Sequence, residues 1–400
     1  MLVVQKYGGT SVGNLERIEN VANRVIKSKK TYKDIVVVVS AMSGRTNQLI
    51  DNANFYSESP NKKELDMLLS CGERETAALL AIALMSKGYD AISLSGKEAG
   101  LLTTDDYTNA KIIDIDATRI KKELSSGKIV VIAGFQGYAA NGNTTTLGRG
   151  GSDLSAVAFA GALNADLCEI YTDVDGVYTT DPRIEPKAKK LDKISYEEML
   201  ELASLGAKVL QNRSVELAKK LNVKLVTRSS FNENSGTIIT SEEKMEQALV
   251  SGIALDKNQA RIVLRRIEDK PGIAASIFTT LAKKDINVDM IIQNVGHDGT
   301  TNLGFTVPQN ELKNASEAMR ELLGSDVVIE SDSDIVKVSV VGVGMKTHSG
   351  VASAAFEALA NEGINIQMIS TSEIKISMIV SSKYAELAVR TLHKVYKLED

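Results

Sequence analysis

Tryptophan, proline, histidine and cysteine are scarce in this chain of 400 residues, which has no tryptophan, five prolines, three histidines and two cysteines. Neither Cys71 nor Cys168 lies in a Cys-x-x-Cys pair, so neither a disulfide framework nor a zinc site is expected. So few cysteines favour a reducing compartment. The histidines, His297, His348 and His393, all lie towards the C-terminus. Their position argues against histidine general-base catalysis in the rest of the chain.

Long apolar runs and a strong net charge are also missing. No apolar run approaches the ~20 residues that span a bilayer, and Met1–Lys6 leads directly into a strand pattern without a signal peptide. The net charge of -4 gives no electrostatic footprint for nucleic acid. A composition of 43% hydrophobic and 24% charged residues is typical of globular proteins, and the length predicts two or three domains. We therefore expect a cytoplasmic protein whose partners are neither membranes nor nucleic acids.

One glycine-rich stretch, from Thr146 to Asp153, leads directly into an apolar, alanine-rich segment that ends at Leu163. Glycines let a backbone approach a ligand closely, and a helix N-terminus offers free N–H groups to an anion. Arg149 adds a planar fork for a carboxylate or phosphate, and Asp153 could orient a cation or a metal-bound phosphate. The simpler alternative is a helix with a flexible lead-in that is capped by Ser152.

Strand and helix patterns alternate over the first 230 or so residues. This alternation predicts an α/β fold with a doubly wound, mostly parallel sheet and helices on both of its faces. The continuous β-branched run at 35–39 is typical of a strand buried on both sides. Strands are expected at 2–7, 35–39, 91–94, 129–133, 167–172 and 223–227, and helices at 15–26, 63–86, 116–125, 152–163, 196–204 and 213–221.

Polar or glycine-rich residues follow four of these strands, namely Lys6–Thr10, Ser40, Gly134–Gly137 and Thr172–Asp173. Open α/β sheets bind ligands at the carboxyl ends of their strands, so these segments are expected to converge. The sequence has no Walker A motif, no His-Glu-x-x-His and no Gly-x-Ser-x-Gly. The lysines, glycines, carboxylates and arginine that remain suit phosphoryl transfer, in which positioning and charge neutralisation dominate.

The chain repeats itself beyond a turn cluster at 232–236. Residues 271–291 align without gaps on 349–369. In both copies a strand leads through a glycine turn to a helix, and a strand and hairpin follow. This pattern predicts a duplicated βαββ-type unit, with copies too small to be comfortably stable alone. The matched pairs include Gly272/Gly350, Phe278/Phe356, Leu281/Leu359, Asn287/Asn365 and Met290/Met368.

Five further segments occur in a fixed order along the chain, namely Lys6–Val12, Val39–Gly44, Gly134–Gly137, Leu147–Asp153 and Tyr171–Arg183. These segments resemble the signature segments of the aspartokinase family, and the duplicated tail resembles the paired ACT domains of that family. The resemblance covers essentially the whole chain. It implies an amino acid kinase catalytic domain at 1–232 and two βαββαβ ACT-like domains at 245–330 and 331–400.

The reaction that this resemblance implies is the phosphorylation of L-aspartate by ATP to 4-phospho-L-aspartate, the first step towards lysine, threonine and methionine. The attacking carboxylate is ionised at pH 7 and needs no general base. By resemblance, Lys6 neutralises the transferring phosphoryl group, Asp153 holds that lysine or the substrate in register, and Lys208 is a second phosphate-contacting lysine. Arg149 would clamp the α-carboxylate of aspartate, and Glu73 would meet its α-ammonium group.

The resemblance also implies the remaining ligand contacts. Mg²⁺ would bridge the phosphates with few direct protein ligands, so no metal-binding residue is assigned. The implied ATP contacts are Lys6, Tyr7, Gly8, Gly9, Thr172, Asp173, Tyr178, Asp181, Arg183, Lys208 and Val209. The implied aspartate contacts are Ser40, Thr46, Glu73, Arg149, Gly150, Gly151, Ser152 and Asp153.

Paired ACT-like units resemble sensors of small amino acids. The loop before the first helix could bind a free carboxylate on backbone N–H groups, and lysine, threonine or both would then favour a less active state. A dimerisation module without a ligand is the alternative, and edge-to-edge strand pairing predicts a homo-oligomer in either case. Met245 lies near the point where some relatives begin a separately made regulatory chain. The implied effector residues are Asp269, Lys270, Pro271, Gly272, Ile273, Ala274, Asn287, Val288, Asp289, Gln293, Asn365, Ile366 and Ser372.

Two other functions compete with an allosteric aspartate kinase. One is another amino-acid or carbamate kinase of the same fold, which the duplicated tail and the Arg149–Asp153 segment disfavour. The other is a non-catalytic amino-acid sensor whose N-terminal domain only holds ATP. The presence of Lys6, Asp153 and Lys208 disfavours that sensor.

Overall fold

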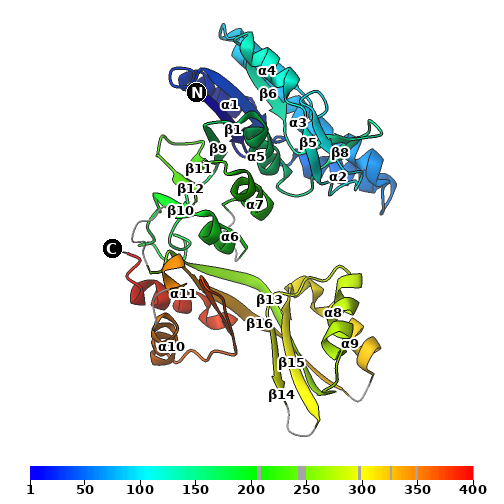
Figure 1. Cartoon of the computed structure of the whole chain (residues 1–400), viewed down its shortest axis with the longest axis vertical. Helices are drawn as coiled ribbons and strands as arrows, with labels where there is room; N and C mark the ends of the chain where they lie inside the picture. Colours follow the sequence, from blue (N-terminus) through cyan, green and yellow to red (C-terminus); the bar gives the residue numbers. More distant parts are fainter. Residues whose placement is uncertain (205–208, 242–248, 296–298, 325–326, 347–349, 400) are drawn as a thin grey trace. The chain divides into compact units, whose positions relative to one another are not determined.

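The chain folds into two compact units (Figure 1). The computed structural model describes residues 1–399 apart from 205–208, 242–248, 296–298, 325–326 and 347–349. The first unit comprises 1–177, 190–203 and 208–244, and the second comprises 178–189, 204–207 and 245–400. Within the described residues, no helix is long and apolar enough to cross a membrane.

An eight-stranded sheet forms the centre of the first unit, and most of its neighbouring strands are parallel (Figure 1). Its strands are β1 (Leu2–Tyr7), β2 (Asp34–Val39), β3 (Ala91–Leu94), β6 (Ile129–Ala133), β9 (Leu167–Thr172), β10 (Lys193–Ser195), β11 (Leu225–Ser229) and β12 (Thr237–Thr240). Their order is β10-β12-β11-β9-β1-β2-β6-β3, and only the β11–β12 pair is antiparallel among them. The central strands are buried on both faces, which confirms the predicted doubly wound arrangement.

Seven helices of the first unit surround this sheet within the described residues. The first one begins where Asn14 accepts a hydrogen bond from the Arg17 N–H at 2.9 Å. Its apolar residues Ile18, Val21, Ala22 and Val25 are buried, whereas Leu15 is exposed. The helices are α1 (Leu15–Ser28), α2 (Arg45–Tyr56), α3 (Lys62–Ser86), α4 (Thr118–Ser125), α5 (Gly151–Leu163), α6 (Tyr196–Ser204) and α7 (Asn212–Leu221).

A second, four-stranded sheet in the first unit was not predicted. Its strands are short, and runs of three or four residues cannot show a period. Residues 136–137, which were expected in a loop, lie in one of them. The strands are β4 (Leu101–Thr103), β5 (Ile112–Ile115), β7 (Gln136–Ala139) and β8 (Thr144–Thr146), in the order β5-β4-β7-β8.

The second unit is built on one six-stranded antiparallel sheet. Its strands are β13 (Gly252–Glu268), β14 (Ile291–Val295), β15 (Thr300–Val307), β16 (Val328–Val341), β17 (Met368–Thr371) and β18 (Lys375–Ser381), in the order β14-β15-β13-β16-β18-β17. Its helices are α8 (Ile273–Lys283), α9 (Leu312–Leu323), α10 (Val351–Asn361) and α11 (Ala385–Val395), with 3₁₀ turns η1 (Gln309–Glu311), η2 (Val343–Lys346) and η3 (Ser382–Tyr384).

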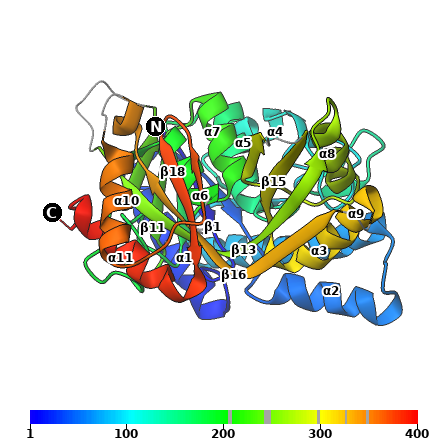
Figure 2. The same cartoon turned by 90° about the horizontal axis from the view of Figure 1, so that it is seen from below.

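Two long strands join the two copies of the repeat. β13 and β16 pair from Gly252/Val341 to Arg265/Val328, so each of them passes through both halves of the unit (Figures 1 and 2). One hydrophobic core contains residues of α8 and α9, and a separate core contains residues of α10 and α11. Ile253 belongs to the second of these cores, although it precedes the first copy in sequence.

A segment from the middle of the chain, residues 178–189, packs within the second unit. The Thr179 carbonyl accepts a hydrogen bond from the Ile253 N–H at 2.7 Å, and the Thr179 hydroxyl lies 3.0 Å from Nε2 of His393. Ile184 packs against the core that contains α10 and α11. These contacts attach the segment to the second half of the repeat, and we call it the strap.

Candidate active site

The carboxyl ends of the central strands are level with one another. In the register of the sheet, Tyr7 pairs with Val39 and with Tyr171, and Val39 pairs with Ala133. The Gly8 N–H donates to the Tyr171 carbonyl at 3.2 Å, directly after β1. The polar segments that follow β1, β2, β6 and β9 therefore leave the sheet at one edge, as expected from the sequence.

A buried ion pair lies at this edge. Nζ of Lys6, on β1, is 2.6 Å from Oδ1 of Asp153, in the first turn of α5. The side chains are 10% and 14% exposed, so both charges are largely removed from water. A Cβ at Gly8 would lie 3.2 Å from Nζ of Lys6, so glycine leaves space around this ammonium group. The arrangement sets a fixed cation beside the N-terminus of a helix, which suits an anionic ligand.

The glycine loop before α5 is held in a conformation that requires glycine. Gly150 has a φ of 73° and is the N-cap of α5, so the Ser152 cap of the simpler alternative is not observed. A Cβ at Gly150 would lie 2.0 Å from Cγ of Gln211, whose amide group donates to the Arg149 carbonyl at 2.9 Å. The Arg149 side chain is exposed. The backbone of the loop is therefore fixed, while its arginine can reach a ligand.

Glu73 reaches the end of β2 from the middle of α3. It is 3% exposed, and its Oε1 accepts a hydrogen bond from the Ala41 N–H at 3.1 Å. Oε2 is buried and has no hydrogen-bond partner among the described residues. Burial raises the pKa of this carboxyl group to about 7. An acceptor in this condition suits an ammonium group, which would pair with it.

Asp66 was not predicted and holds the start of the glycine loop. This fully buried carboxylate accepts hydrogen bonds from the Thr108 N–H, the Thr146 N–H and the Thr146 hydroxyl, the last at 2.6 Å. Burial raises the pKa of Asp66, and these hydrogen bonds act in the opposite direction by lowering it. Asp66 precedes Glu73 by two helical turns on α3, so the two carboxylates share a face. This spacing is the signal in the sequence that could have identified Asp66.

The other residues predicted to bind aspartate lie beside this edge. Ser40 is half-buried and directly follows β2, and its N–H donates to the Tyr7 carbonyl at 3.1 Å. Thr46 is half-buried in the first turn of α2. A Cβ at Gly151 would lie 2.9 Å from Cβ of Leu147, so this position also requires glycine.

The residues predicted to bind ATP are divided between the two units. Thr172 ends β9, and its hydroxyl donates to the exposed Asp173 carboxylate at 3.0 Å. Tyr178, Asp181 and Arg183 lie in the strap, where Arg183 and Asp181 form an ion pair of 2.7 Å. Val209 is half-buried, and Lys208 lies outside the described residues.

Every residue predicted to bind an effector is exposed or half-buried. α8 begins after Gly272, which has a φ of 94° and so lies in the left-handed region that favours glycine. Lys270 pairs with Glu268 at 2.6 Å, and Asp289 pairs with the buried Lys337. The predicted carboxylate-binding loop therefore precedes a helix N-terminus, as the sequence indicated.

Comparison with known proteins defines the class of this protein. The amino acid kinase family model matches residues 1–229, and the ACT domain model matches residues 262–323 and 338–396. The chain therefore belongs to the amino acid kinase family and carries two ACT matches.

Full-length relatives narrow this class further. The chain is 61% identical to the aspartokinase of Helicobacter pylori over 100% of both chains, and 54% identical to the aspartokinase of Pseudomonas aeruginosa over 100% of this chain and 98% of that protein. Its structure matches E. coli aspartokinase III in complex with aspartate and ADP, with a TM-score of 0.82 at 26% identity over 99% of each chain. Within the amino acid kinase family, the chain is thus a member of the aspartokinases, the ATP-dependent aspartate kinases.

Proposed function

We propose that this chain transfers the γ-phosphoryl group of ATP to the side-chain carboxylate of L-aspartate. The product would be 4-phospho-L-aspartate, which enters the synthesis of lysine, threonine and methionine. The single observation that carries the proposal is the buried Lys6–Asp153 pair at the carboxyl edge of the sheet. The solved E. coli relative, which holds aspartate and ADP, supports it.

The chemical task is to bring two anions into bonding distance. Lys6 neutralises charge on the transferring phosphoryl group, and Asp153 fixes the position of the lysine ammonium. Backbone N–H groups at Gly8, Gly9 and the start of α5 add donors for phosphate oxygens. The aspartate carboxylate attacks in its ionised form, so no general base is required. Catalysis by positioning and charge neutralisation is typical of phosphoryl transfer.

The substrate is held at both of its other charged groups. Glu73 Oε2 pairs with the α-ammonium group of aspartate, since it is a buried acceptor without a partner among the described residues. Arg149 binds the α-carboxylate through its planar fork, and Ser40 and Thr46 add hydrogen bonds. These contacts select a small amino acid with a second carboxylate.

The nucleotide lies on the other side of the transferring phosphoryl group. Its proposed contacts include Tyr178 against the adenine and Lys208 on a phosphate. Mg²⁺ supplies charge neutralisation between the phosphates when it is bound. Within the described residues, no group of three or more His, Cys, Asp or Glu side chains could hold a metal ion. The cation is proposed to be held mainly by phosphate oxygens. The remaining proposed contacts are Tyr7, Thr172, Asp173, Asp181, Arg183 and Val209.

The second unit is proposed to bind an end-product amino acid and to lower activity. The E. coli relative is also solved in complex with lysine and aspartate, with a TM-score of 0.78 at 26% identity over 98% of this chain. Exposed edge strands such as β14 are proposed to pair between copies and form a homo-oligomer. A separately made regulatory chain that starts near Met245 and a cytoplasmic location also remain proposals. Met245 lies outside the described residues.

A hydroxamate assay, which traps acyl phosphates, tests this proposal. It is run with ATP and aspartate, glutamate or N-acetylglutamate, and we expect product with aspartate only. Addition of lysine, threonine and both together then identifies the effector. Product with glutamate or acetylglutamate but not with aspartate would show a different amino acid kinase, and no product with any substrate would favour a non-catalytic sensor.

A further inference from the structure

The glycine loop is held by an arginine that is not among the predicted ligand contacts. Arg213 is half-buried in the first turn of α7. Its Nη1 donates to the Leu147 carbonyl at 2.6 Å, and its Nη2 donates to the Ala110 carbonyl at 3.4 Å. Oδ1 of Asn109 accepts a further hydrogen bond from Nη1 at 3.4 Å. One guanidinium group therefore joins the loop to residues 109–110.

A second side chain at the start of α7 holds another carbonyl of the loop. The Gln211 side chain accepts from the Arg213 N–H at 2.9 Å and donates to the Arg149 carbonyl at 2.9 Å. In a trans peptide group the carbonyl and the N–H point in opposite directions. The N–H groups of Gly148 and Gly150, which belong to the same peptide groups as the two held carbonyls, therefore point away from these side chains. Neither N–H has a hydrogen-bond partner among the described residues.

The segment on the other side of Arg213 is strained. Thr108 has a φ of 72°, a left-handed conformation that is unfavourable for a β-branched residue. Its N–H donates to both carboxylate oxygens of Asp66, at 3.1 and 3.0 Å. A Cβ at Gly148 would lie 3.2 Å from the Thr108 carbonyl oxygen, so the strained segment packs directly against the loop. Such strain persists only where surrounding contacts fix the backbone, and it collects at binding sites.

We propose that Arg213 is a positioning residue for aspartate, which fixes the glycine loop without touching the substrate. Its planar fork reaches carbonyl groups of two separate segments in a fixed geometry, which the single ammonium group of a lysine cannot do. The clamped loop presents the Arg149 side chain and the free N–H groups of Gly148 and Gly150 to the α-carboxylate. Donors that are fixed in advance need little ordering when the anion binds. The inference rests on the proposed function in taking aspartate as the ligand of this loop.

Steady-state kinetics of Arg213→Gln with aspartate and ATP test this inference. The α-carboxylate is bound equally in the ground state and in the transition state, so the KM for aspartate should rise about 10-fold or more, while kcat stays within about 2-fold of the native value. The KM for ATP should not change. Arg213→Lys keeps a cation that can reach the Leu147 carbonyl, so it should recover part of the affinity. A purely structural role would instead lower the thermal transition and, through a smaller folded fraction, kcat, while both KM values stay native.

A double-mutant cycle with Arg149→Ala shows whether Arg213 acts through the loop. If Arg213 acts mainly by placing Arg149, its loss matters less once Arg149 is absent. The KM for aspartate of the double variant should then exceed that of Arg149→Ala by less than about 3-fold. Two independent effects would multiply.

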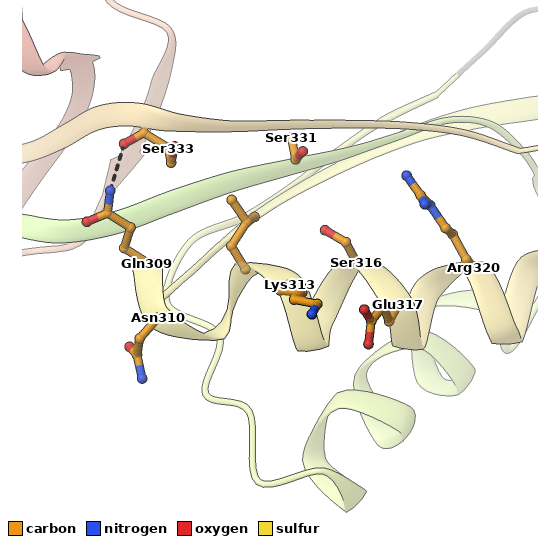
Figure 3. Close-up of a pocket in the computed structure, with 9 residues that line it drawn as sticks. Gln309, Asn310, Lys313, Ser316, Glu317, Arg320, Ser331 and Ser333 are labelled. Carbon is orange, nitrogen blue, oxygen red and sulfur yellow. Dashed lines mark hydrogen bonds between the residues drawn. The ribbon is translucent and has the colours of Figure 1, made fainter.

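Arg320→Gln is the matched control. Arg320 is an exposed arginine of α9 in the second unit, where it lines a cavity between α9 and β16 (Figure 3). Figure 3 shows it at the end of the cavity away from Gln309. Without effector, this variant should have the native KM values for aspartate and ATP.

Three results would overturn the inference. They are a native KM for aspartate in Arg213→Gln, an equal rise in the KM for ATP, and multiplying effects in the cycle. If the native chain does not phosphorylate aspartate, the proposed function fails, whereas an active native chain with an unaffected Arg213→Gln refutes only the positioning role. Calorimetric titration with aspartate measures the same loss of affinity without turnover, so a chain that binds aspartate but does not phosphorylate it still tests Arg213.

Discussion

Lys6 and Asp153 form a 2.6 Å ion pair between the end of a central strand and the first turn of a helix. Each charge is fixed by an element that the sheet holds rigidly. The cation therefore needs little rearrangement when an anionic ligand arrives, which is the condition under which a charge contact stabilises a transition state most effectively.

Lys6→Ala should lower kcat about 100-fold or more, because it removes a charge contact to the transferring phosphoryl group. Steady-state kinetics with aspartate and ATP measure the effect. Lys30→Ala is the control, since Lys30 is exposed on the turn after α1. Unchanged turnover in Lys6→Ala would remove Lys6 from the reaction.

Arg149→Ala should mainly raise the KM for aspartate, by about 10-fold or more, because a bidentate contact to a carboxylate is lost. The Arg149 side chain is exposed, so the thermal transition should not change. The KM for ATP is the internal control. A variant with normal affinity for aspartate and weakened ATP binding would assign Arg149 to the nucleotide.

Apolar patterning predicted six of the eight strands of the large sheet, because these six are apolar runs, whereas the short strands β10 and β12 were not predicted. β1, β3, β6 and β9 have the predicted bounds, and β2 begins one residue earlier than predicted. The predicted strand at 223–227 is shifted by two residues, since β11 spans Leu225–Ser229. The long strands β13 and β16 extend far beyond the runs expected at 262–265 and 336–341, because each continues from one copy of the repeat into the other.

The positions of the candidate site residues could be predicted where these residues lie at the ends of strands. Lys6 and Gly8 could be placed at one edge from topology alone. Asp66 lies on a helix, and only its spacing of two turns from Glu73 distinguishes it from an ordinary surface carboxylate. The strap could not be foreseen either. It lies within a segment that resembles the catalytic domain, yet Ile184 packs in the core that contains α10 and α11.

The affinity for aspartate should depend on pH through Glu73. Burial raises the pKa of this group to about 7, so it gains a proton as the pH falls below 7 and can no longer pair with an ammonium group. The KM for aspartate should therefore rise as the pH falls from 8 to 6. In Glu73→Gln the KM for aspartate should be higher than in the native chain, and it should not change with pH around 7. A persistent rise in that variant would assign the titration to another group.

The same shift predicts an effect on stability. The folded-state pKa of Glu73 lies above its ordinary value of 4.5, so its contribution is favourable at low pH and is lost as the pH rises through about 7. Without ligand, Glu73→Gln should be more stable than the native chain above pH 7, by on the order of 1–3 kcal/mol. Urea denaturation at pH 8 and pH 5 measures the difference, which should shrink at pH 5.

Asp66→Asn should destabilise the protein by about 1–3 kcal/mol, because one buried acceptor is replaced by a donor that faces the Thr108 and Thr146 donors. It should also lower kcat, since Thr146 begins the glycine loop. Asp51→Asn, an exposed carboxylate on α2, is the control for stability and activity. Full activity in a destabilised Asp66→Asn would limit Asp66 to a structural role.

The strap should loosen from the second half of the repeat in acid. His393 is buried, and burial lowers its pKa below the ordinary value of 6.5, against the smaller effects of Glu185 and Glu399. A lowered pKa means that the neutral imidazole is favoured in the fold. Its contribution to stability is therefore present above pH 6.5 and is lost as the pH falls through the lowered pKa.

His393→Gln should lower the free energy of unfolding by about 1 kcal/mol at pH 7.5, through a weaker contact to Thr179, and should reduce the loss of stability in acid. Urea denaturation at pH 7.5, 6.5 and 5.5 measures both effects, and Thr179→Val, which removes the contact and keeps the imidazole, should retain the acid dependence. Equal acid dependence in His393→Gln and the native chain would show that another group titrates.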